Sequence, residues 1–198
     1  MRHAHHDPGG RFLQHACQGL TPLGIGQARA LAARLAAEVG SAPVVVLASR
    51  SARAITTAEI VADALGVAVA ERTCDLCEVH PGAAEGLTPA EMERRFGPSY
   101  RHVPGADWWP DWLPRAGAAL DRIARDYRGR LIVAATHSGV IRASLVHLGG
   151  MPPDRAARIR SANTAVTAWA CDDPARDGSG AWRLERHDDG SHLAVPPA

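Results

Sequence analysis

Residues 43–66 read PVVVLASRSARAITTAEIVADALG, and this stretch determines the class of fold. Residues 43–49 form a short apolar run rich in β-branched side chains, which is typical of a strand buried on both faces of a parallel sheet. Residues 51–65 have a helical pattern, and Gly66 ends the helix. A buried strand followed directly by a helix predicts an α/β protein.

Similar units lie on both sides of this stretch. Thr21-Pro22 is a good helix start, and residues 88–91 (Thr-Pro-Ala-Glu) have the spacing of a capping box. The alternation predicts a single domain over residues 1–198, with three layers (α/β/α) and a mostly parallel central sheet. We expect helices over 22–39, 89–96, 115–127 and 140–148, buried strands over 67–70 and 131–136, and weaker strands over 164–171 and 181–186, split by a loop over 172–180.

The composition excludes several classes of function. The 198-residue chain has 46% hydrophobic residues and a formal net charge of +1, so we expect a globular protein that binds neither nucleic acid nor an anionic membrane. All 22 basic residues are arginine, which excludes a lysine Schiff base and a phosphate-binding loop that ends in Gly-Lys-Ser/Thr. Arginine instead favours bidentate contact with phosphate or carboxylate.

The N-terminus and the cysteines point to the cytoplasm. The N-terminus is polar and the apolar runs are short, so we expect neither a signal peptide nor a membrane span. Four cysteines are too few for a disulfide scaffold. Cys74 and Cys77 have the spacing of half a zinc site, but no second pair follows, so we interpret them as ordinary thiols and predict no metal site.

The candidate chemistry lies where the predicted strands end, because ligands of parallel α/β sheets bind at the carboxyl ends of the strands. Arginines in this position can clamp a phosphoryl group, one imidazole can attack phosphorus, and a protonated carboxyl group can protonate the leaving oxygen. Each such residue alone is more often structural, so the prediction rests on their joint placement. The strand ends carry Arg53, Glu78 and His137, and the N-terminus adds Arg2 and His3, which would also lie at a strand end if a strand preceded them.

Six motifs, four of which contain these residues, follow in order along the chain. They are Arg2-His3-Ala4; Leu20-Thr21 with Gly24 and Gln27-Ala28; Ser49 with Arg53-Ala54 and Thr57-Ala58; Leu76-Cys77-Glu78 with Gly82 and Glu85-Gly86; Pro104-Gly105-Ala106-Asp107; and Thr136-His137-Ser138-Gly139-Val140-Ile141-Arg142. The series resembles the histidine phosphatase superfamily, in the branch that includes cofactor-dependent phosphoglycerate mutase and many small phosphatases. The resemblance implies a phosphoglycerate mutase-like fold.

The resemblance also implies a metal-independent phosphatase without a cofactor that hydrolyses a small-molecule phosphomonoester. His3 would carry the phosphoryl group as phosphohistidine, while Glu78 protonates the leaving alkoxide and later takes a proton from water. We expect a small phosphoester as the partner and a monomer or a homodimer. The phosphate-binding and substrate-binding residues that the resemblance implies are Arg2, Arg53, His137, Gln18, Gly19 and Ser138.

The sequence departs from the family pattern in the segment after His3. Ala4 replaces the usual glycine, and residues 5–7 (His-His-Asp) replace the common Glu-Thr. The family's phosphate-contacting asparagine has no counterpart, because Asn163 is the only asparagine, and Asp107 replaces the turn glutamate. The chain is also short for a phosphoglycerate mutase and lacks its longer insertion, so a phosphatase is favoured over a mutase-type phosphotransferase.

Two other interpretations stay open. The first is a metal-dependent hydrolase, because His3, His5 and Asp7 have a metal-ligand spacing that His147, His187 or His192 would complete. It leaves Arg53 and Glu78 unexplained. The second is a phosphoryl-ligand binding protein that has lost turnover.

Residues 107–112 (Asp-Trp-Trp-Pro-Asp-Trp) contain three of the five tryptophans, Trp108, Trp109 and Trp112. One interpretation is a loop that packs on the core. The other is an aromatic wall that accepts an apolar or ring-bearing leaving group. The sequence does not decide between them.

The family pattern places a central strand directly before Arg2-His3, whereas only Met1 precedes the pair here. Four buried apolar side chains of such a strand would contribute roughly 6–12 kcal/mol, at about 1.5–3 kcal/mol each, which is comparable to the stability of a whole domain. We therefore expect that the first central strand is missing and that the polypeptide begins upstream of Met1. The alternative is that another segment, such as 164–171, fills its position.

Overall fold

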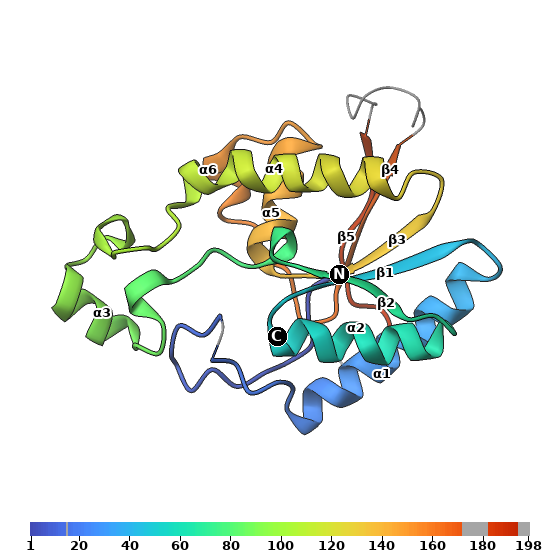
Figure 1. Ribbon diagram of the computed structural model, residues 1–198, viewed down its shortest axis with the longest axis horizontal. Coiled ribbons are helices and arrows are strands. Elements are labelled where there is room, and N and C mark those ends of the chain that lie inside the picture. The colour runs from blue at the N-terminus through green and yellow to red at the C-terminus, as the bar shows by residue number, and fades with distance from the viewer. Residues whose placement is uncertain (15, 172–181, 194–198) are drawn as a thin grey trace.

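The computed structural model describes residues 1–14, 16–171 and 182–193 (Figure 1), so the predicted loop 172–180 and residue 181 lie outside it. The strands are β1 (Val44–Ser49), β2 (Val69–Thr73), β3 (Leu131–Ala135), β4 (Val166–Cys171) and β5 (Trp182–Asp189). The helices are α1 (Pro22–Val39), α2 (Ala52–Ala64), α3 (Pro89–Phe96), α4 (Trp109–Asp126), α5 (Ser138–His147) and α6 (Pro153–Ala156), with 3₁₀ turns η1 (Cys74–Leu76), η2 (Gly82–Ala84) and η3 (Tyr100–His102). None of the described helices is long and apolar enough to span a membrane.

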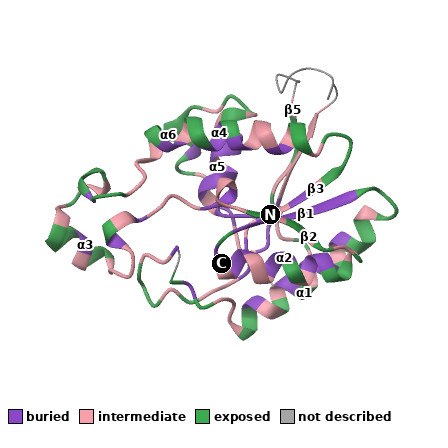
Figure 2. Ribbon diagram, in the orientation of Figure 1, coloured by how far each residue is buried: buried purple, intermediate pink, exposed green. Residues whose placement is uncertain are grey.

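Three parallel strands form the central sheet in the order β2–β1–β3. β1 is buried along its whole length (Figure 2). Its side chains alternate between two hydrophobic cores. Val44, Val46 and Ala48 pack with α1 and α2, whereas Val45 and Leu47 pack with α4 and α5. Helices therefore cover both faces of the sheet (Figure 1), and the predicted three-layer α/β/α fold is confirmed.

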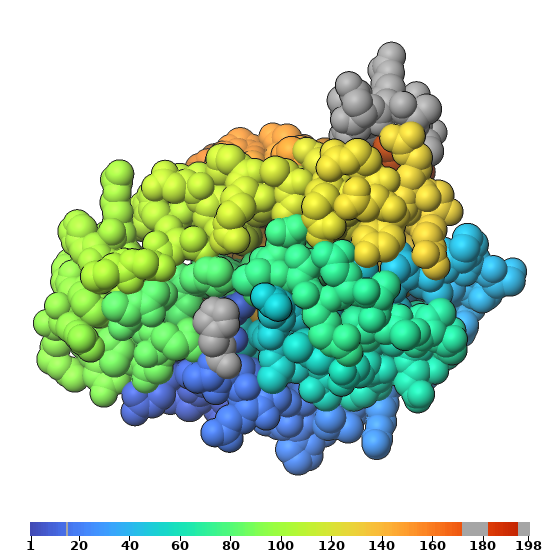
Figure 3. Space-filling model, viewed as in Figure 1, coloured from blue at the N-terminus to red at the C-terminus, as the bar shows by residue number. Residues whose placement is uncertain are grey.

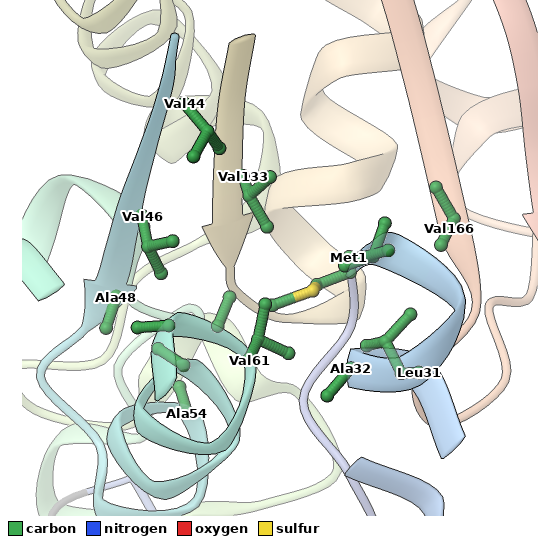
Figure 4. Packing of buried hydrophobic residues seen from close by; sticks show 14 residues of the cluster. Met1, Leu31, Ala32, Val44, Val46, Ala48, Ala54, Val61, Val133 and Val166 are labelled. Atoms are coloured by element: carbon green, nitrogen blue, oxygen red, sulfur yellow. The ribbon is translucent and has the colours of Figure 1, made fainter. Parts of the chain in front are cut away.

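The N-terminus lies between β3 and β4. Thr136, directly after β3, forms a parallel bridge with Arg2 and accepts a hydrogen bond from the backbone N–H of His3 at 2.8 Å. On the other side, the Arg2 N–H donates to the carbonyl of Ala165 at 3.2 Å. The side chain of Met1 packs in the core with residues of α1, α2, β3 and β4 (Figure 4). These contacts place the Arg2-His3 pair at the carboxyl edge of the sheet.

β4 and β5 form a separate antiparallel pair. Both weaker strand predictions are therefore confirmed, although β5 continues to Asp189 rather than ending at 186. The alternative in which residues 164–171 fill a position in the central sheet is wrong, because β4 pairs with β5 and with no other strand in the described part of the chain.

Helix α4 begins at Trp109, earlier than the predicted 115. Pro110 and Pro114 suggest a later start, but Pro110 lies in the first turn, where a backbone N–H has no intrahelical partner. Trp112 is 3% exposed, and Trp109 stacks on it with ring centroids 5.6 Å apart. Burial of these rings outweighs the hydrogen bond that Pro114 removes. For these two tryptophans the core-packing interpretation is confirmed.

Candidate active site

The backbone around His3 is fixed by side chains from two other parts of the fold. The carbonyl of His3 accepts a hydrogen bond from Asn163 Nδ2 at 3.0 Å, and the N–H of Ala4 donates to Thr57 Oγ1 at 3.0 Å. Thr57 lies on α2, and Asn163 lies shortly before β4. Together with the bond to Thr136, these contacts determine the position of the ring, which is only 4% exposed.

The ring of His3 is oriented through both nitrogens. Nδ1 lies 2.8 Å from the carbonyl oxygen of Ala4, so Nδ1 carries the hydrogen. Nε2 accepts a hydrogen bond from Arg53 Nε at 3.2 Å, so the lone pair is at Nε2. Burial, and then the charge of Arg53, hold the pKa of His3 well below its ordinary value of 6.5. His3 is therefore a neutral imidazole with a nucleophilic Nε2.

Arg53, in the first turn of α2, connects His3 to His137. Its Nη2 lies 3.1 Å from His137 Nδ1 and also donates to Gln14 Oε1 at 3.0 Å. Nη1 donates to the carbonyl of Leu13 at 3.0 Å. The residue is 3% exposed, so a full positive charge is held between two imidazoles with little solvent to screen it.

His137 follows β3 and caps α5. Its Nε2 lies 2.7 Å from Oγ of Ser49, the last residue of β1, and 3.3 Å from Oγ of Ser51, the N-cap of α2. Its ring centroid is 5.0 Å from that of His3. Burial, followed by the nearby imidazole of His3 and the charge of Arg53, keeps the pKa of His137 well below 6.5. His137 is therefore neutral and turns Nδ1 toward Arg53.

Three buried side-chain nitrogens near these rings find no hydrogen-bond partner among the described residues: Arg2 Nε, His6 Nδ1 and Gln14 Nε2. Arg2 donates from Nη1 to the carbonyl of Ser161, and burial lowers its pKa. The ring of His6 stacks on His3 at 5.1 Å, and burial lowers the pKa of His6 to about 4. A buried polar group without a partner costs about 1–3 kcal/mol. Such atoms beside two guanidinium groups suit an oxyanion that accepts several hydrogen bonds.

Glu78 lies at the N-terminus of α5. Its Oε2 accepts from the N–H of Gly139 at 3.1 Å, and its Oε1 accepts from the N–H of Val79 at 3.1 Å. A Cβ at position 139 would overlap Glu78 Oε1, so a larger residue there would displace the carboxyl group. The carboxyl group is therefore placed beside His137 by the start of the same helix.

A pocket of about 330 Å³ opens beside Glu78. In the space-filling view (Figure 3), the surface is also hollowed where the N-terminal residues meet the start of α2 and the segment after η1. An aromatic wall is present, but Phe12 and Tyr100 form it, with ring centroids 5.5 Å apart. Trp108 lies within 5.9 Å of the Arg101 guanidinium and does not line this pocket. The lining residues are Phe12, Leu13, Gln14, Glu78, Val79, Pro81 and Tyr100.

The remaining predicted residues are placed as follows. Ser138 is the first residue of α5, next to His137. Gln18 is exposed, and Gly19 has a φ of 98°, so the predicted role of this pair in binding substrate stays a prediction. His5 and Asp7 do not join His3 in a metal-ligating group within the described residues: His5 Nδ1 lies 2.8 Å from Thr21 Oγ1, and Asp7 accepts from the N–H of Gly9. The ligand set of the metal-dependent alternative is therefore not brought together in the described part of the chain.

The family model of the histidine phosphatase superfamily (branch 1) matches residues 1–184. The chain belongs to this superfamily. A curated relative, a metal-independent phosphoserine phosphatase from Arabidopsis thaliana, is 29% identical over 195 residues, which cover 93% of this chain and 77% of the relative.

Solved structures agree with this membership at the level of the fold. Bacillus stearothermophilus YhfR superposes with a TM-score of 0.81 at 23% identity, covering 96% of both chains. A mycobacterial glucosyl-3-phosphoglycerate phosphatase, solved with VO3, superposes with a TM-score of 0.78 at 23% identity, covering 95% of this chain and 96% of that one. The family predicted from the six motifs is confirmed.

Gln14 and His6 are residues near the candidate site that the superfamily motifs did not reveal. Gln14 is 2% exposed and presents an amide to the same region as Arg53, so it offers a donor of the kind that the missing asparagine would provide. His6 lies in the departing segment after Ala4. The sequence indicates both residues only weakly: each is a polar side chain in an irregular segment close to the Arg2-His3 motif.

Proposed function

We propose that this protein is a metal-independent phosphoric monoester hydrolase that acts on a small molecule through phosphohistidine at His3. One observation carries the proposal: two buried, neutral histidines contact the same buried guanidinium, with unpaired donors next to them. Neutral imidazole is the form that attacks phosphorus, and the guanidinium attracts the phosphoryl oxygens. Membership of the histidine phosphatase superfamily supports this assignment.

In the first step, the Nε2 lone pair of His3 attacks phosphorus and the ester P–O bond breaks. Arg2 and Arg53 bind the phosphoryl oxygens, and His137 stabilises the charge on them. Glu78 transfers its carboxyl proton to the departing oxygen, so the product leaves as a neutral alcohol. The negative charge of the bound phosphoryl group favours the protonated form of a neighbouring carboxyl group.

In the second step, water attacks the phosphohistidine. The ionised Glu78 takes a proton from the water, the P–N bond breaks, and its electron pair returns to Nε2 of His3. Inorganic phosphate leaves, and both residues regain their starting forms. Two guanidinium groups and two imidazoles supply the positive and polar contacts that a metal ion supplies in other phosphatases.

The pocket beside Glu78 supports a substrate class. The proton donor lies at one end of a lining that is otherwise mostly apolar and includes Phe12 and Tyr100. We propose that the alcohol part of the substrate has an apolar or ring-bearing portion, which packs on these rings. The Arabidopsis relative is named a phosphoserine phosphatase, so phosphoserine is the natural comparison substrate. The four free thiols support a reducing compartment, and we propose the cytoplasm.

The test uses a labelled phosphoester and rapid quenching without acid. We expect one labelled phosphate per chain on His3, labile to acid and stable to base, and the same label on His3 in protein treated with a chelator. Release of inorganic phosphate, rather than transfer to a second substrate, separates a phosphatase from a mutase. Loss of the label on chelation, or label on a residue other than His3, would contradict the proposal.

A further inference from the structure

A second cluster of reactive side chains lies on the segment that carries Glu78. Cys74, Cys77 and His80 each offer one ligand atom, and these atoms all lie within 4.8 Å of one another. Cys77 is buried, whereas Cys74 and His80 are half-buried. Of the described residues, only these three form a group with metal-ligand spacing.

The local backbone brings the three side chains together. Cys74 begins η1, and the N–H of Cys77 donates back to the carbonyl of Cys74 at 3.0 Å. This tight turn places the two sulfur atoms on one side. His80 follows three residues later, with Nε2 only 3.4 Å from the sulfur of Cys74.

The other side of the His80 ring faces a carboxylate. Asp107 Oδ2 lies 3.6 Å from His80 Nδ1 and accepts from the backbone N–H of His80 at 2.9 Å. The N–H of Asp107 in turn donates to the carbonyl of His80 at 2.9 Å, and Arg115 Nη2 donates to the same Oδ2 at 2.9 Å. Histidines that bind metals usually present the second ring nitrogen to a carboxylate, which fixes the ring and makes the first nitrogen a better ligand.

We propose that Cys74, Cys77 and His80 bind a thiophilic divalent cation, zinc above all. Two thiolates and one imidazole are typical zinc ligands. With Zn–S bonds of about 2.3 Å, two sulfurs of a tetrahedral site lie about 3.8 Å apart, which is compatible with ligand atoms that all lie within 4.8 Å of one another. The two thiols release two protons to solvent on binding, and water completes the coordination on the exposed side.

This site is separate from the phosphoryl chemistry. Its ligands come from η1 and the turn after it, whereas the nucleophile and the phosphate-binding arginines come from the N-terminus and α2. Glu78 lies between Cys77 and His80 in the chain, so a bound ion fixes both flanks of the segment that carries the proposed proton donor. The role of the ion is therefore to order this segment and not to contact the substrate.

The experiment uses the full-length chain, stripped with a chelator and kept reduced. Zinc is titrated against a chromophoric chelator, and cobalt is used as a spectroscopic substitute. We expect one equivalent of zinc, a higher melting temperature with zinc, and thiolate-to-cobalt charge-transfer absorption. Cys74→Ser, Cys77→Ser and His80→Gln should each weaken zinc binding at least about 10-fold, and Asp107→Asn about 10-fold to 100-fold. Cys17→Ser and Cys171→Ser are the matched controls and should bind zinc like the parent.

Several results would overturn the proposal. They are no stoichiometric binding, cobalt bound without thiolate absorption, or equal losses in the Cys17→Ser control. Formation of a Cys74–Cys77 disulfide at the same rate with and without zinc would identify a redox pair instead of a metal site. The cobalt spectrum of the parent protein needs no variant, so it decides even where a substitution impairs folding.

Discussion

Two clusters of side chains that contain histidines lie at the carboxyl edge of the sheet, and the charged groups beside the histidines differ between them. His3 and His137 face the guanidinium of Arg53, whereas His80 faces the carboxylate of Asp107 and two thiols. A cation beside a buried imidazole keeps it neutral and leaves a site that attracts anions. An anion beside an imidazole strengthens it as a ligand for a cation. Imidazole side chains can therefore help to bind an anion in one cluster and a cation in the other, depending on the charge of the groups beside them.

The largest effect that tests this contrast is the removal of the nucleophile. His3→Ala should reduce kcat by about 10⁴-fold or more, because no other group can accept the phosphoryl group at that position. Steady-state release of phosphate measures the loss. His147→Ala is the matched control, since this histidine pairs with Asp121 at the surface. Turnover by His3→Ala near the parental rate would contradict the assignment of His3 as the nucleophile.

Replacement of the proton donor should depend on the leaving group. Glu78→Gln should slow alkyl phosphates by about 10²–10⁴-fold, because the amide cannot protonate the alkoxide. It should slow p-nitrophenyl phosphate much less, because that leaving group departs without a proton. Glu59→Gln, an exposed glutamate paired with Arg72, is the control. Equal losses on both substrates would show that Glu78 is not the donor.

The planar guanidinium of Arg53 can be replaced by the compact ammonium group of lysine. Arg53→Lys keeps the charge but loses the planar fork that contacts His3, His137 and Gln14 together. We expect kcat/KM to fall by about 10²-fold, which corresponds to one or two charge-assisted hydrogen bonds. Arg72→Lys, at the surface, serves as the control. A variant with parental kcat/KM would mean that the reaction needs only the positive charge at position 53 and not the planar guanidinium.

The free energy of unfolding should fall gradually as the pH is lowered, because His3 and His137 are neutral in the folded protein. The pKa values of His3 and His137 lie well below 6.5 in the folded protein, so below pH 6.5 the unfolded chain binds protons that the folded chain excludes. The free energy of unfolding should therefore fall as pH is lowered from 6.5 toward 5, by at most about 1.4 kcal/mol per pH unit for each ring, and this contribution should be flat above pH 7.

Urea unfolding between pH 5 and 8 measures this slope, with a constant m-value as the check that the unfolded state is the same. His137→Gln should remove part of the slope. A free energy of unfolding that stays constant or rises toward pH 5 in the parent protein would contradict the neutral state of these rings.

Most of the fold was predictable because its signals are local. Residues 43–66 gave β1 and α2 from pattern alone, and the rule for strand ends brought Arg53 and His137 to one edge with His3. The start of α4 was not predictable in this way. Its prolines are local signals against a helix, whereas the burial of Trp112 depends on residues far away in the sequence.

The missed parts of both clusters lie in irregular segments. Gln14 reaches Arg53 from a stretch without helix or strand, so no periodicity indicates which way its side chain points. The sequence does not indicate His80 as a ligand, because the spacing of Cys74 and Cys77 indicates a zinc site only where a second cysteine pair follows. The turn that returns His80 to Cys74 depends on Asp107, which is 27 residues further along the chain.

The hydroxyl of Ser49 lies between the two clusters, 2.7 Å from His137 Nε2 and 3.9 Å from Cys77 Sγ. A hydroxyl has a single hydrogen, so it can point toward only one of these atoms at a time. If it points to sulfur, Ser49 must accept a hydrogen from Nε2, and Nδ1 of His137 keeps its lone pair. If it points to His137, Nε2 accepts it and Nδ1 carries the hydrogen, so two donors, Nδ1–H and Arg53 Nη2, face each other at 3.1 Å unless an oxyanion accepts from both. The rotation of one O–H bond therefore links a hydrogen bond to a cysteine sulfur with the tautomer of a histidine on the neighbouring strand end.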